Sequence, residues 1–297
     1  MKLLRNNLLE AFVAVVECGG FTDAQYALGI TQSAISCRIR DLEHALGYRV
    51  CERGRGGFCL TERGQIAYKK ARDVLRSVRD FDAELMDLRG TITGELRIGM
   101  VDTVNGLPGF PLVSAIRRFL NRENDVRLEV SVASPTDLTQ SLISGNVHVA
   151  IAPFRNKVSE LEYTEICTED HMLYCSSDHP LFHADSREIT PDILTRFPIC
   201  QRSYDKIVPP KLFTLAPQAV VANMEAMAML IESGCYLGAL PVHFGQKWIE
   251  SGQFRALDHP DLRWTSAFSL AVRKSQARRR AVELFLTDIM AVSHKAS

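Results

Sequence analysis

Hydrophobic residues near the N-terminus recur every three or four positions, the spacing that gathers them on one face of a helix. A first run covers residues 8–16 and stops at a pair of glycines. Thr22 is a suitable N-cap for a second, short helix, which Gly29 closes. The start of the chain therefore predicts two helices separated by a tight turn.

A third helix is expected to open at Thr31 or Gln32 and to run to Gly47. Two helices joined by a short glycine-containing turn are typical of a helix-turn-helix. The second helix of this motif lies in the major groove of DNA, with its N-terminal residues toward the base edges. Its apolar residues are expected to face the core: Ile35, Ile39 and Leu42. The pattern predicts a DNA-binding module.

The positions after the third helix predict a small β-hairpin. Residues 48–53 form its first strand, 54–57 a glycine-rich turn, and 58–60 its return strand. Arg53 and Arg55, near the turn, are placed to reach phosphates or the minor groove. The hairpin would be the wing of a winged helix-turn-helix.

Residues 61–89 are expected to form one long helix capped by Thr61. Its apolar positions alternate spacings of four and three, the heptad seam of a helix that pairs with another by knobs-into-holes packing. The seam residues are Ala67, Ala71, Val74, Val78, Phe81, Leu85 and Leu88. The length of the helix favours dimerisation, whereas a single helix packed on its own domain would show the same stripe.

Strands and helices alternate from residue 95 onward, which predicts an α/β fold with a mostly parallel sheet. The chain is thus expected to be α/β overall, with three parts. These are a winged helix-turn-helix domain over 1–62, a linker helix for dimerisation over 62–90, and a two-lobed α/β domain similar to periplasmic binding proteins over 91–297. Its lobe I comprises about 95–162 and 266–297, and its lobe II about 163–265.

Net charge is zero for the whole chain, but charge is unevenly distributed. Residues 1–72 carry eleven Lys and Arg against seven Asp and Glu, a net charge of +4. The segment 38–72 alone has nine against four, a net charge of +5. A basic patch confined to one small domain is the electrostatic pattern expected of a module that binds DNA.

The first sixty residues resemble the signature of the LysR family of bacterial transcriptional regulators. The run that carries the resemblance consists of Phe12, Gly19, Gly20, Phe21, Thr22, Ala24, Ala27, Leu28, Thr31, Gln32, Ser33, Ala34, Ile35, Ser36, Ile39, Arg40, Leu42, Glu43, Leu46, Gly47, Arg53, Leu60, Thr61 and Gly64. Within this run, Gly20 replaces a Ser that is frequent in the family. Ser33 departs from the family's usual Pro, which bears on the bases that are read. The resemblance implies a regulator that binds promoter DNA as a homodimer, commonly a homotetramer, and whose two-lobed domain binds a small-molecule effector.

Short polar side chains at the start of the third helix are candidates for base contacts. Gln32 suits a bidentate contact with adenine, and Ser33 suits a base or a phosphate. Arg38 and Arg40 lie further along the helix, where phosphate contact is expected. The DNA-binding candidates are Thr22, Thr31, Gln32, Ser33, Ser36, Arg38, Arg40, Arg53 and Arg55.

Ligands of open α/β sheets bind beyond the carboxyl ends of the strands, where helix N-termini offer free N–H groups. This rule selects Asp102, Thr103, Ser134, Thr136, Gln201, Arg202 and Asn223, and the matching positions of the family line the effector cleft. The hydroxyls and the Arg202 guanidinium suit a carboxylate-bearing metabolite, although the hydroxyls are equally suited to cap helices. Asp102 is awkward beside an anionic ligand and would prefer an amine or a hydroxyl.

His148 stands where the LysR family usually has Asp, and it joins the effector-binding candidates. Near the cleft it would add sensitivity to pH or ligand, the alternative being a structural histidine. Two other sensing modes stay open: a metal site built on Cys175, His179 and His183, and oxidation of Cys200. A helix-breaking Pro180 argues against the first, and the absence of a second cysteine over 201–215 argues against the second.

The sequence carries no Gly-x-Ser-x-Gly, phosphate loop or paired His/Glu motif, so neither an enzyme nor a cofactor or metal is expected. No apolar run reaches the roughly 18–20 residues of a membrane span, and the first residues do not form a secretory signal. We therefore expect a cytoplasmic protein. Its expected partners are double-stranded promoter DNA, a small-molecule effector, RNA polymerase and further copies of the chain.

Overall fold

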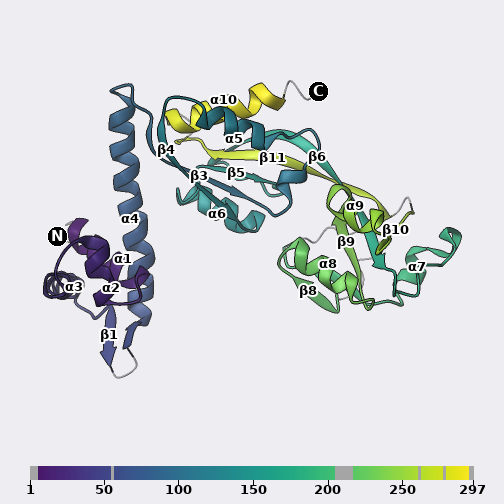
Figure 1. Cartoon of the computed structure of the whole chain (residues 1–297), viewed down its shortest axis with the longest axis horizontal. Helices are drawn as coiled ribbons and strands as arrows, with labels where there is room; N and C mark the ends of the chain where they lie inside the picture. Colours follow the sequence, from purple (N-terminus) through teal and green to yellow (C-terminus); the bar gives the residue numbers. More distant parts are fainter. Residues whose placement is uncertain (1–5, 55–56, 205–216, 260–261, 277–278, 294–297) are drawn as a thin grey trace. The chain divides into compact units, whose positions relative to one another are not determined.

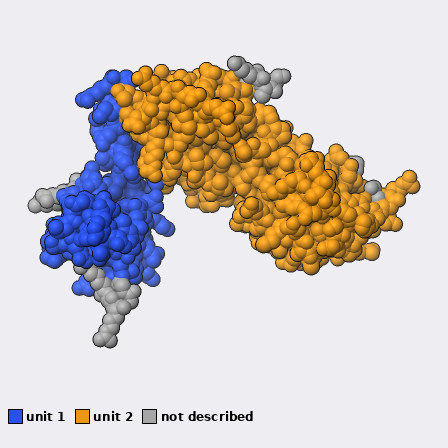
Figure 2. Space-filling view, viewed as in Figure 1, with its two compact units in different colours: residues 1–90 blue, residues 91–297 orange. Residues whose placement is uncertain are grey.

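The computed structural model describes residues 6–54, 57–204, 217–259, 262–276 and 279–293 (Figure 1). The chain divides into two compact units, residues 1–90 and 91–297, which Figure 2 shows in different colours. Each unit contains hydrophobic core of its own, as expected of separate domains. Along the described ranges, every helix is too short or too polar to cross a membrane.

The first unit consists of three short helices, a β-hairpin and a long C-terminal helix. Its elements are α1 (Asn6–Glu17), α2 (Phe21–Leu28), α3 (Gln32–Leu46), β1 (Cys51–Gly54), β2 (Gly57–Leu60) and α4 (Glu62–Asp87). Ile35, Ile39 and Leu42 of α3 are buried in the core, as their spacing predicts. The polar face of α3 is therefore the face left to solvent.

The start of α2 differs from the prediction. The helix begins at Phe21 with Gly20 at the N-cap, so Thr22 lies exposed in the first turn rather than capping it. Phe21 is buried and packs edge to face against Phe58, with ring centroids 6.0 Å apart. Burying an aromatic ring outweighs a threonine cap, which contributes only about 1 kcal/mol.

The predicted hairpin is present, with antiparallel pairing of Cys51–Gly54 and Gly57–Leu60. The first strand starts at residue 51 rather than 48. The reason is Glu43 of α3, whose carboxylate accepts a hydrogen bond from the backbone N–H of Val50 at 2.9 Å. A side chain of the helix thus accepts the Val50 N–H, while the Val50 carbonyl oxygen still accepts the backbone N–H of Thr61 at 3.1 Å. The predicted turn residue Arg55 lies outside the described residues.

The first turn of α4 is fixed against the hairpin. Thr61 caps the helix, as predicted, because its Oγ1 accepts a hydrogen bond from the backbone N–H of Gly64 at 2.9 Å. Gly64 is buried, and a Cβ at this position would overlap the carbonyl oxygen of Val50. Glycine is therefore required where α4 meets the chain entering β1. The helix ends at Asp87, two residues earlier than expected.

The heptad stripe of α4 covers two different surfaces. Ala71 is buried in the core of the first unit, and Ala67 packs partly against it. Farther along, Phe81, Leu85 and Leu88 keep 58, 46 and 83% of their surface exposed. Packing on its own domain therefore accounts for the first half of the stripe only. The second half is an apolar surface that is exposed in the single chain.

The second unit has two α/β lobes joined by two long strands, β6 (Leu161–Ser176) and β11 (Trp264–Arg273). Lobe I contains β3 (Thr93–Met100), η1 (Val104–Gly106), α5 (Leu112–Leu120), β4 (Asp125–Val132), α6 (Pro135–Ile143), β5 (Val149–Ala152) and α10 (Arg280–Ser293). Lobe II contains η2 (Ser186–Glu188), α7 (Pro191–Leu194), β7 (Ile199–Arg202), β8 (Ala219–Val221), α8 (Met224–Glu232), β9 (Leu237–Pro241), α9 (Val242–Glu250) and β10 (Phe254–Leu257).

The expectation of a mostly parallel sheet is wrong. The strand order is β4-β3-β5-β11-β6-β9-β7-β8, with β10 paired to β6. β3 runs parallel to β4 and β5, and β7 runs parallel to β8 and β9. β6 and β11 run antiparallel to each other and to their other partners, because one carries the chain into lobe II and the other returns it. The sheet is therefore mixed.

The C-terminal helix α10 is fastened to α5 by a buried carboxylate. Asp288 has no exposed surface and accepts hydrogen bonds from Arg118 Nε and Arg122 Nη2, both at 2.7 Å. Burial alone would raise the pKa of Asp288, but the hydrogen bonds from Arg122 and Arg118 lower it below its ordinary value. The last helix thus completes lobe I through a charged contact as well as through its apolar face.

Candidate DNA interface and effector cleft

The N-terminal turn of α3 presents short polar side chains. Thr31 Oγ1 accepts a hydrogen bond from the backbone N–H of Ala34 at 3.3 Å, as predicted for a cap, and lies 2.9 Å from the Ser33 hydroxyl. The Ser36 hydroxyl donates to the carbonyl oxygen of Gln32 at 2.9 Å. The exposed amide of Gln32 has no hydrogen-bond partner among the described residues. The turn is therefore held by its hydroxyls, and Gln32 is available to an external partner.

The other DNA-binding candidates of the first unit lie on several elements. Arg40 is exposed on α3 and Arg38 is partly exposed, and neither forms an ion pair with any residue that the structure describes. Thr22 is exposed on α2. Arg53 belongs to β1, and Arg55 is outside the described ranges. Their contacts with DNA stay predictions.

In the second unit, the loop after β3 reaches lobe II through Asp102. Its Oδ2 accepts a hydrogen bond from the backbone N–H of Met224, the first residue of α8, at 2.5 Å. Its Oδ1 lies 3.5 Å from Arg202 Nη2 and 3.4 Å from the Tyr204 hydroxyl. Asn223 caps α8 by accepting a backbone N–H of the first turn at 2.8 Å. Three predicted candidates from both lobes thus meet at one helix N-terminus.

Thr103, the next residue, is held in an unusual backbone conformation. Its φ of 65° is the only positive value at a non-glycine position in the described part of the chain. Such a conformation costs of the order of 1–3 kcal/mol and is typical of functional loops. The Thr103 carbonyl oxygen lies 3.3 Å from His243 Nε2 of α9. His243 was not predicted, because it follows β9 by two residues inside a helix that the sequence pattern did not separate from the strand.

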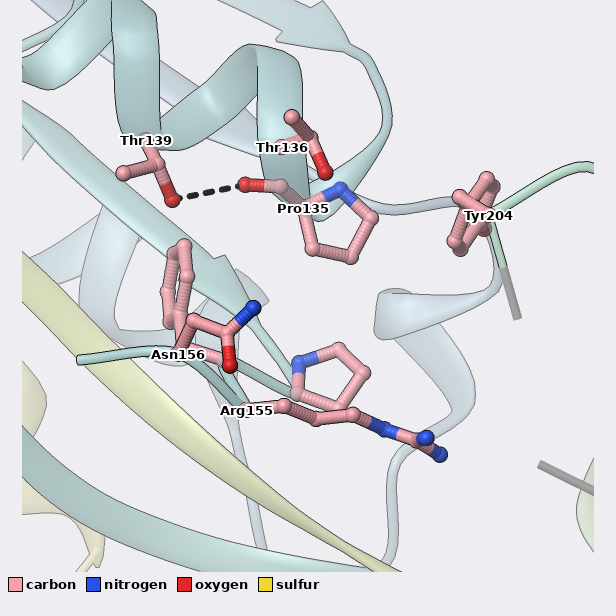
Figure 3. A pocket seen from close by; sticks show the side chains of 8 residues that line it. Pro135, Thr136, Thr139, Arg155, Asn156 and Tyr204 are labelled. Atoms are coloured by element: carbon pink, nitrogen blue, oxygen red, sulfur yellow. Dashed lines mark hydrogen bonds between the residues drawn. The ribbon is translucent and has the colours of Figure 1, made fainter. Parts of the chain in front are cut away.

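A cavity of about 110 Å³ lies beside the start of α6 (Figure 3). Its lining residues are Pro135, Thr136, Thr139, Pro153, Phe154, Arg155, Asn156 and Tyr204. Thr136 is the predicted candidate among them. Ser134 is instead the cap of α6: its hydroxyl accepts the backbone N–H of Asp137 at 3.2 Å and donates to that carboxylate at 2.7 Å. Arg155 and Tyr204 were missed, although the strand-end rule applied to β5 and β7 leads to both.

Gln201 and Arg202 point to different surroundings although they are neighbours in β7. Gln201 is half-buried, whereas Arg202 is 7% exposed and turns its guanidinium toward Asp102. The Arg202 Nη1 also donates to the Tyr204 hydroxyl at 2.5 Å. Side chains on successive strand residues point to opposite faces, so only Arg202 joins the group around Asp102.

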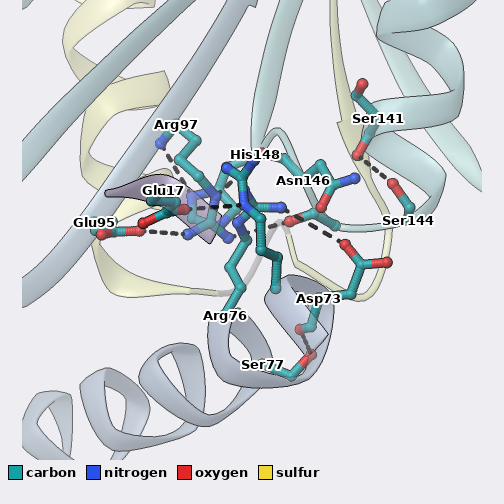
Figure 4. A network of polar contacts seen from close by, with 12 residues as sticks. Glu17, Asp73, Arg76, Ser77, Glu95, Arg97, Ser141, Ser144, Asn146 and His148 are labelled. Carbon is teal, nitrogen blue, oxygen red and sulfur yellow. Dashed lines mark hydrogen bonds and ion pairs between the residues drawn. The ribbon is translucent and has the colours of Figure 1, made fainter. Parts of the chain in front are cut away.

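His148 does not belong to this cleft, which corrects its prediction. The fully buried ring precedes β5, at the end of the strand away from the cleft loops. Its Nε2 lies 2.5 Å from Arg97 Nη2 and 2.7 Å from Arg279 Nη1 (Figure 4). Arg97 is itself buried and also donates to the Glu95 carboxylate at 3.0 Å. His148 is a structural residue of lobe I, and the sequence could not show that two arginines converge on it.

We expect His148→Asp to stabilise lobe I. A carboxylate accepts hydrogen bonds from both guanidinium groups and offsets their charge, whereas a neutral imidazole offers one lone pair. Hydrogen bonds to charged groups contribute about 1.5–3 kcal/mol, and the smaller side chain loses part of that in packing, so a gain of about 1 kcal/mol is expected. Thermal unfolding checks it against His148→Asn, which has similar size and no charge. Equal melting temperatures for the two variants would contradict the charge argument.

The residues of the alternative sensing modes do not assemble. In the described ranges, no group of three or more His, Cys, Asp or Glu is arranged to hold a metal. Cys175 is fully buried, and burial lowers the pKa of His179, whose ring lies against Phe197. Cys200 is buried too, which raises the pKa of its thiol to about 11 and suppresses the thiolate that oxidants attack.

Comparison with known proteins agrees with this architecture. The model of the bacterial regulatory helix-turn-helix of the lysR family matches residues 6–65, and the model of the LysR substrate binding domain matches residues 89–292. A winged helix-turn-helix joined to a two-lobed binding domain defines a ligand-responsive DNA-binding regulator. The chain belongs to the LysR family of transcriptional regulators, with a C-terminal effector-binding domain. The resemblance noted in the sequence is confirmed.

Relatives match nearly the whole chain. The HTH-type transcriptional activator BauR of Pseudomonas aeruginosa is 32% identical over 96% of this chain and 94% of its own length. The SDS degradation transcriptional activation protein of a Pseudomonas species is 27% identical over 93% of this chain and 92% of its own. Full-length CbnR in complex with its target DNA superposes with a TM-score of 0.66, at 19% identity over 97% of this chain and all of CbnR. The last likeness concerns the fold.

Proposed function

We propose that the chain binds a two-fold promoter site as a dimer, with α3 of each copy in a major groove. An effector held between the lobes of the second unit changes how the dimer, or a tetramer of two dimers, is set on DNA and so alters access of RNA polymerase. The role is regulatory, not catalytic. The observation that carries the proposal is the N-terminal turn of α3. There the exposed Gln32 amide has no partner among the residues that the structure describes, while the Thr31 and Ser36 hydroxyls bond to the backbone.

Dimerisation is supported by the second half of α4. Phe81, Leu85 and Leu88 form an exposed apolar stripe with the spacing of a heptad seam. A symmetric dimer presents two copies of α3 to the two halves of a pseudo-palindromic site. The wing arginines, Arg53 and Arg55, would contact flanking phosphates or the minor groove.

Effector binding is supported by the convergence of polar groups from both lobes around Asp102, Arg202 and the N-terminus of α8. A ligand that makes contacts with both lobes favours one lobe arrangement over another in proportion to its difference in affinity. By linkage, DNA must change the affinity for the effector by the same factor as the effector changes the affinity for DNA. A carboxylate-bearing metabolite fits the donors of this group.

Two substitutions on α3 distinguish a residue that contacts bases from one that contacts phosphates. Gln32→Ala is expected to weaken binding to the specific site about tenfold, since a bidentate base contact contributes about 1–3 kcal/mol, and to leave non-specific binding unchanged. Arg40→Ala is expected to weaken all sequences similarly and to lower the salt slope of log K by about 1. The affinities are measured at two salt concentrations on the site that footprinting upstream of its own gene reveals. Uniform losses for both variants would contradict these assignments.

A further inference from the structure

The carboxylate of Asp102 lies at the N-terminus of α8, where an anionic ligand would bind. It comes from lobe I, yet its Oδ2 accepts the backbone N–H of Met224 at the start of α8 in lobe II. Its Oδ1 also lies 3.5 Å from the Arg202 guanidinium. Helix N-termini and guanidinium groups are donors that proteins commonly use for small oxyanions. A side chain of the protein itself thus fills an oxyanion position.

The N-terminus of α8 is suited to an anion. The helix has nine residues, and the backbone N–H groups of a first turn have no carbonyl partner within the helix and lie at the positive end of its dipole. Asn223 accepts one of these N–H groups at 2.8 Å, and Asp102 accepts that of Met224. The Asn223 cap therefore leaves the Met224 N–H free to bind another acceptor, and Asp102 is that acceptor.

Arg202 supplies an independent observation. It is 7% exposed, its Nη2 faces Asp102, and its Nε has no hydrogen-bond partner among the residues described. A buried guanidinium nitrogen without an acceptor is costly. At 3.5 Å, the Asp102 carboxylate does not form the two short parallel bonds that a free carboxylate makes with guanidinium. The Arg202 guanidinium therefore has hydrogen-bond donors that Asp102 does not use.

We propose that Arg202, the Tyr204 hydroxyl and the Met224 N–H form a carboxylate subsite of the effector cleft, and that Asp102 occupies it as a built-in competitor. The inference rests on the proposed effector function and specifies it. Two carboxylates repel each other at such a distance, so a ligand carboxylate enters only when Asp102 leaves. Its departure removes a contact that joins lobe I to α8. Ligand binding is thereby coupled to the lobe arrangement. The apparent affinity for the ligand is the intrinsic affinity multiplied by the fraction of molecules in which Asp102 has left the subsite.

The test uses the full chain with acetate as the probe and chloride at equal ionic strength as the reference. Asp102→Ala vacates the subsite, so acetate is expected to raise its melting temperature saturably, with an apparent affinity at least tenfold tighter than for the unsubstituted chain. Asp192→Ala, which removes an exposed lobe II carboxylate, is the matched control and is expected to behave like the unsubstituted chain. Tyr204→Phe, added to Asp102→Ala, removes one hydroxyl without emptying the core and is expected to weaken acetate severalfold.

Two results overturn the proposal. One is an Asp102→Ala chain that responds to acetate no more than to chloride while it still binds DNA, which leaves the proposed regulatory function intact. The other is equal acetate affinity with and without Asp102, which removes its role as a competitor. Tight acetate binding by Asp102→Ala with no ligand effect on DNA affinity supports the subsite, and it is the coupling in the proposed function that then fails.

Discussion

Gly64→Ala is expected to unfold the DNA-binding unit locally and to abolish specific DNA binding. The new Cβ would overlap the carbonyl oxygen of Val50, which cannot move away. The Val50 N–H is held by Glu43 at 2.9 Å, and its carbonyl oxygen accepts the backbone N–H of Thr61 at 3.1 Å. Overpacking of a fixed backbone costs about 3 kcal/mol, a large part of the stability of a small domain. Hydrogen exchange of the α1 and α3 amides in the full chain measures the loss.

Gln65→Ala is the control for this substitution. Gln65 is the next residue of α4 and is exposed, so its replacement is expected to change stability by no more than about 0.5 kcal/mol. Exchange from the second unit is expected to stay unchanged in both variants, because its cores are separate. Unchanged protection of α1 and α3 in Gly64→Ala would show that the hairpin can move away from α4, contrary to the expectation.

The double substitution Phe81→Glu and Leu85→Glu is expected to produce monomers with specific DNA affinity reduced at least about 100-fold. In the single chain these side chains are 58 and 46% exposed, and burying charge in a heptad seam is strongly unfavourable. A monomer binds one half-site and loses the gain of about 10²–10⁴ that linkage of two binding modules supplies. Sedimentation equilibrium gives the oligomeric state, and titration with operator DNA gives the affinity.

Asp82→Lys, on the same turn of α4, is the control for the effect of a change in charge outside the stripe. Asp82 is exposed but lies off the stripe, so this variant is expected to stay oligomeric. The folding of both variants is compared by far-ultraviolet circular dichroism. A double variant that folds and remains a dimer would place the interface elsewhere on the chain. One that is monomeric yet binds the full operator as tightly as the unsubstituted chain would remove the dimer from the proposed DNA recognition.

Local pattern predicted the first unit well because its determinants are close together in the sequence. The buried face of α3 follows from the spacing of Ile35, Ile39 and Leu42, and the cap at Thr31 follows from the preference of hydroxyls for helix starts. The cap at Thr22 was wrong for a nonlocal reason. Phe21 packs against Phe58 across the hairpin, and no local preference carries that information.

The mixed sheet shows a second reason why the sequence pattern did not predict the whole fold. The pattern of alternating strands and helices identifies lobes of parallel strands, which the structure contains. It does not show that β6 continues for sixteen residues and is shared with the other lobe. A strand shared by two lobes meets a different environment along its length, so its hydrophobic period is interrupted.

Helical period and turn chemistry act over a few residues, so they sufficed to predict the family, the helix-turn-helix with its wing, and the heptad stripe of α4. The use made of the polar candidates depends instead on contacts between distant segments. Asp102 meets a helix start 122 residues away, and His148 meets an arginine 131 residues away. The strand-end rule selected Asp102 and the family's usual Asp drew attention to His148, yet Asp102 joins two lobes and His148 is buried within one. The strands shared by the two lobes bring distant segments together, and this decides which partner a polar group meets. Burial then requires that the group form a hydrogen bond with that partner.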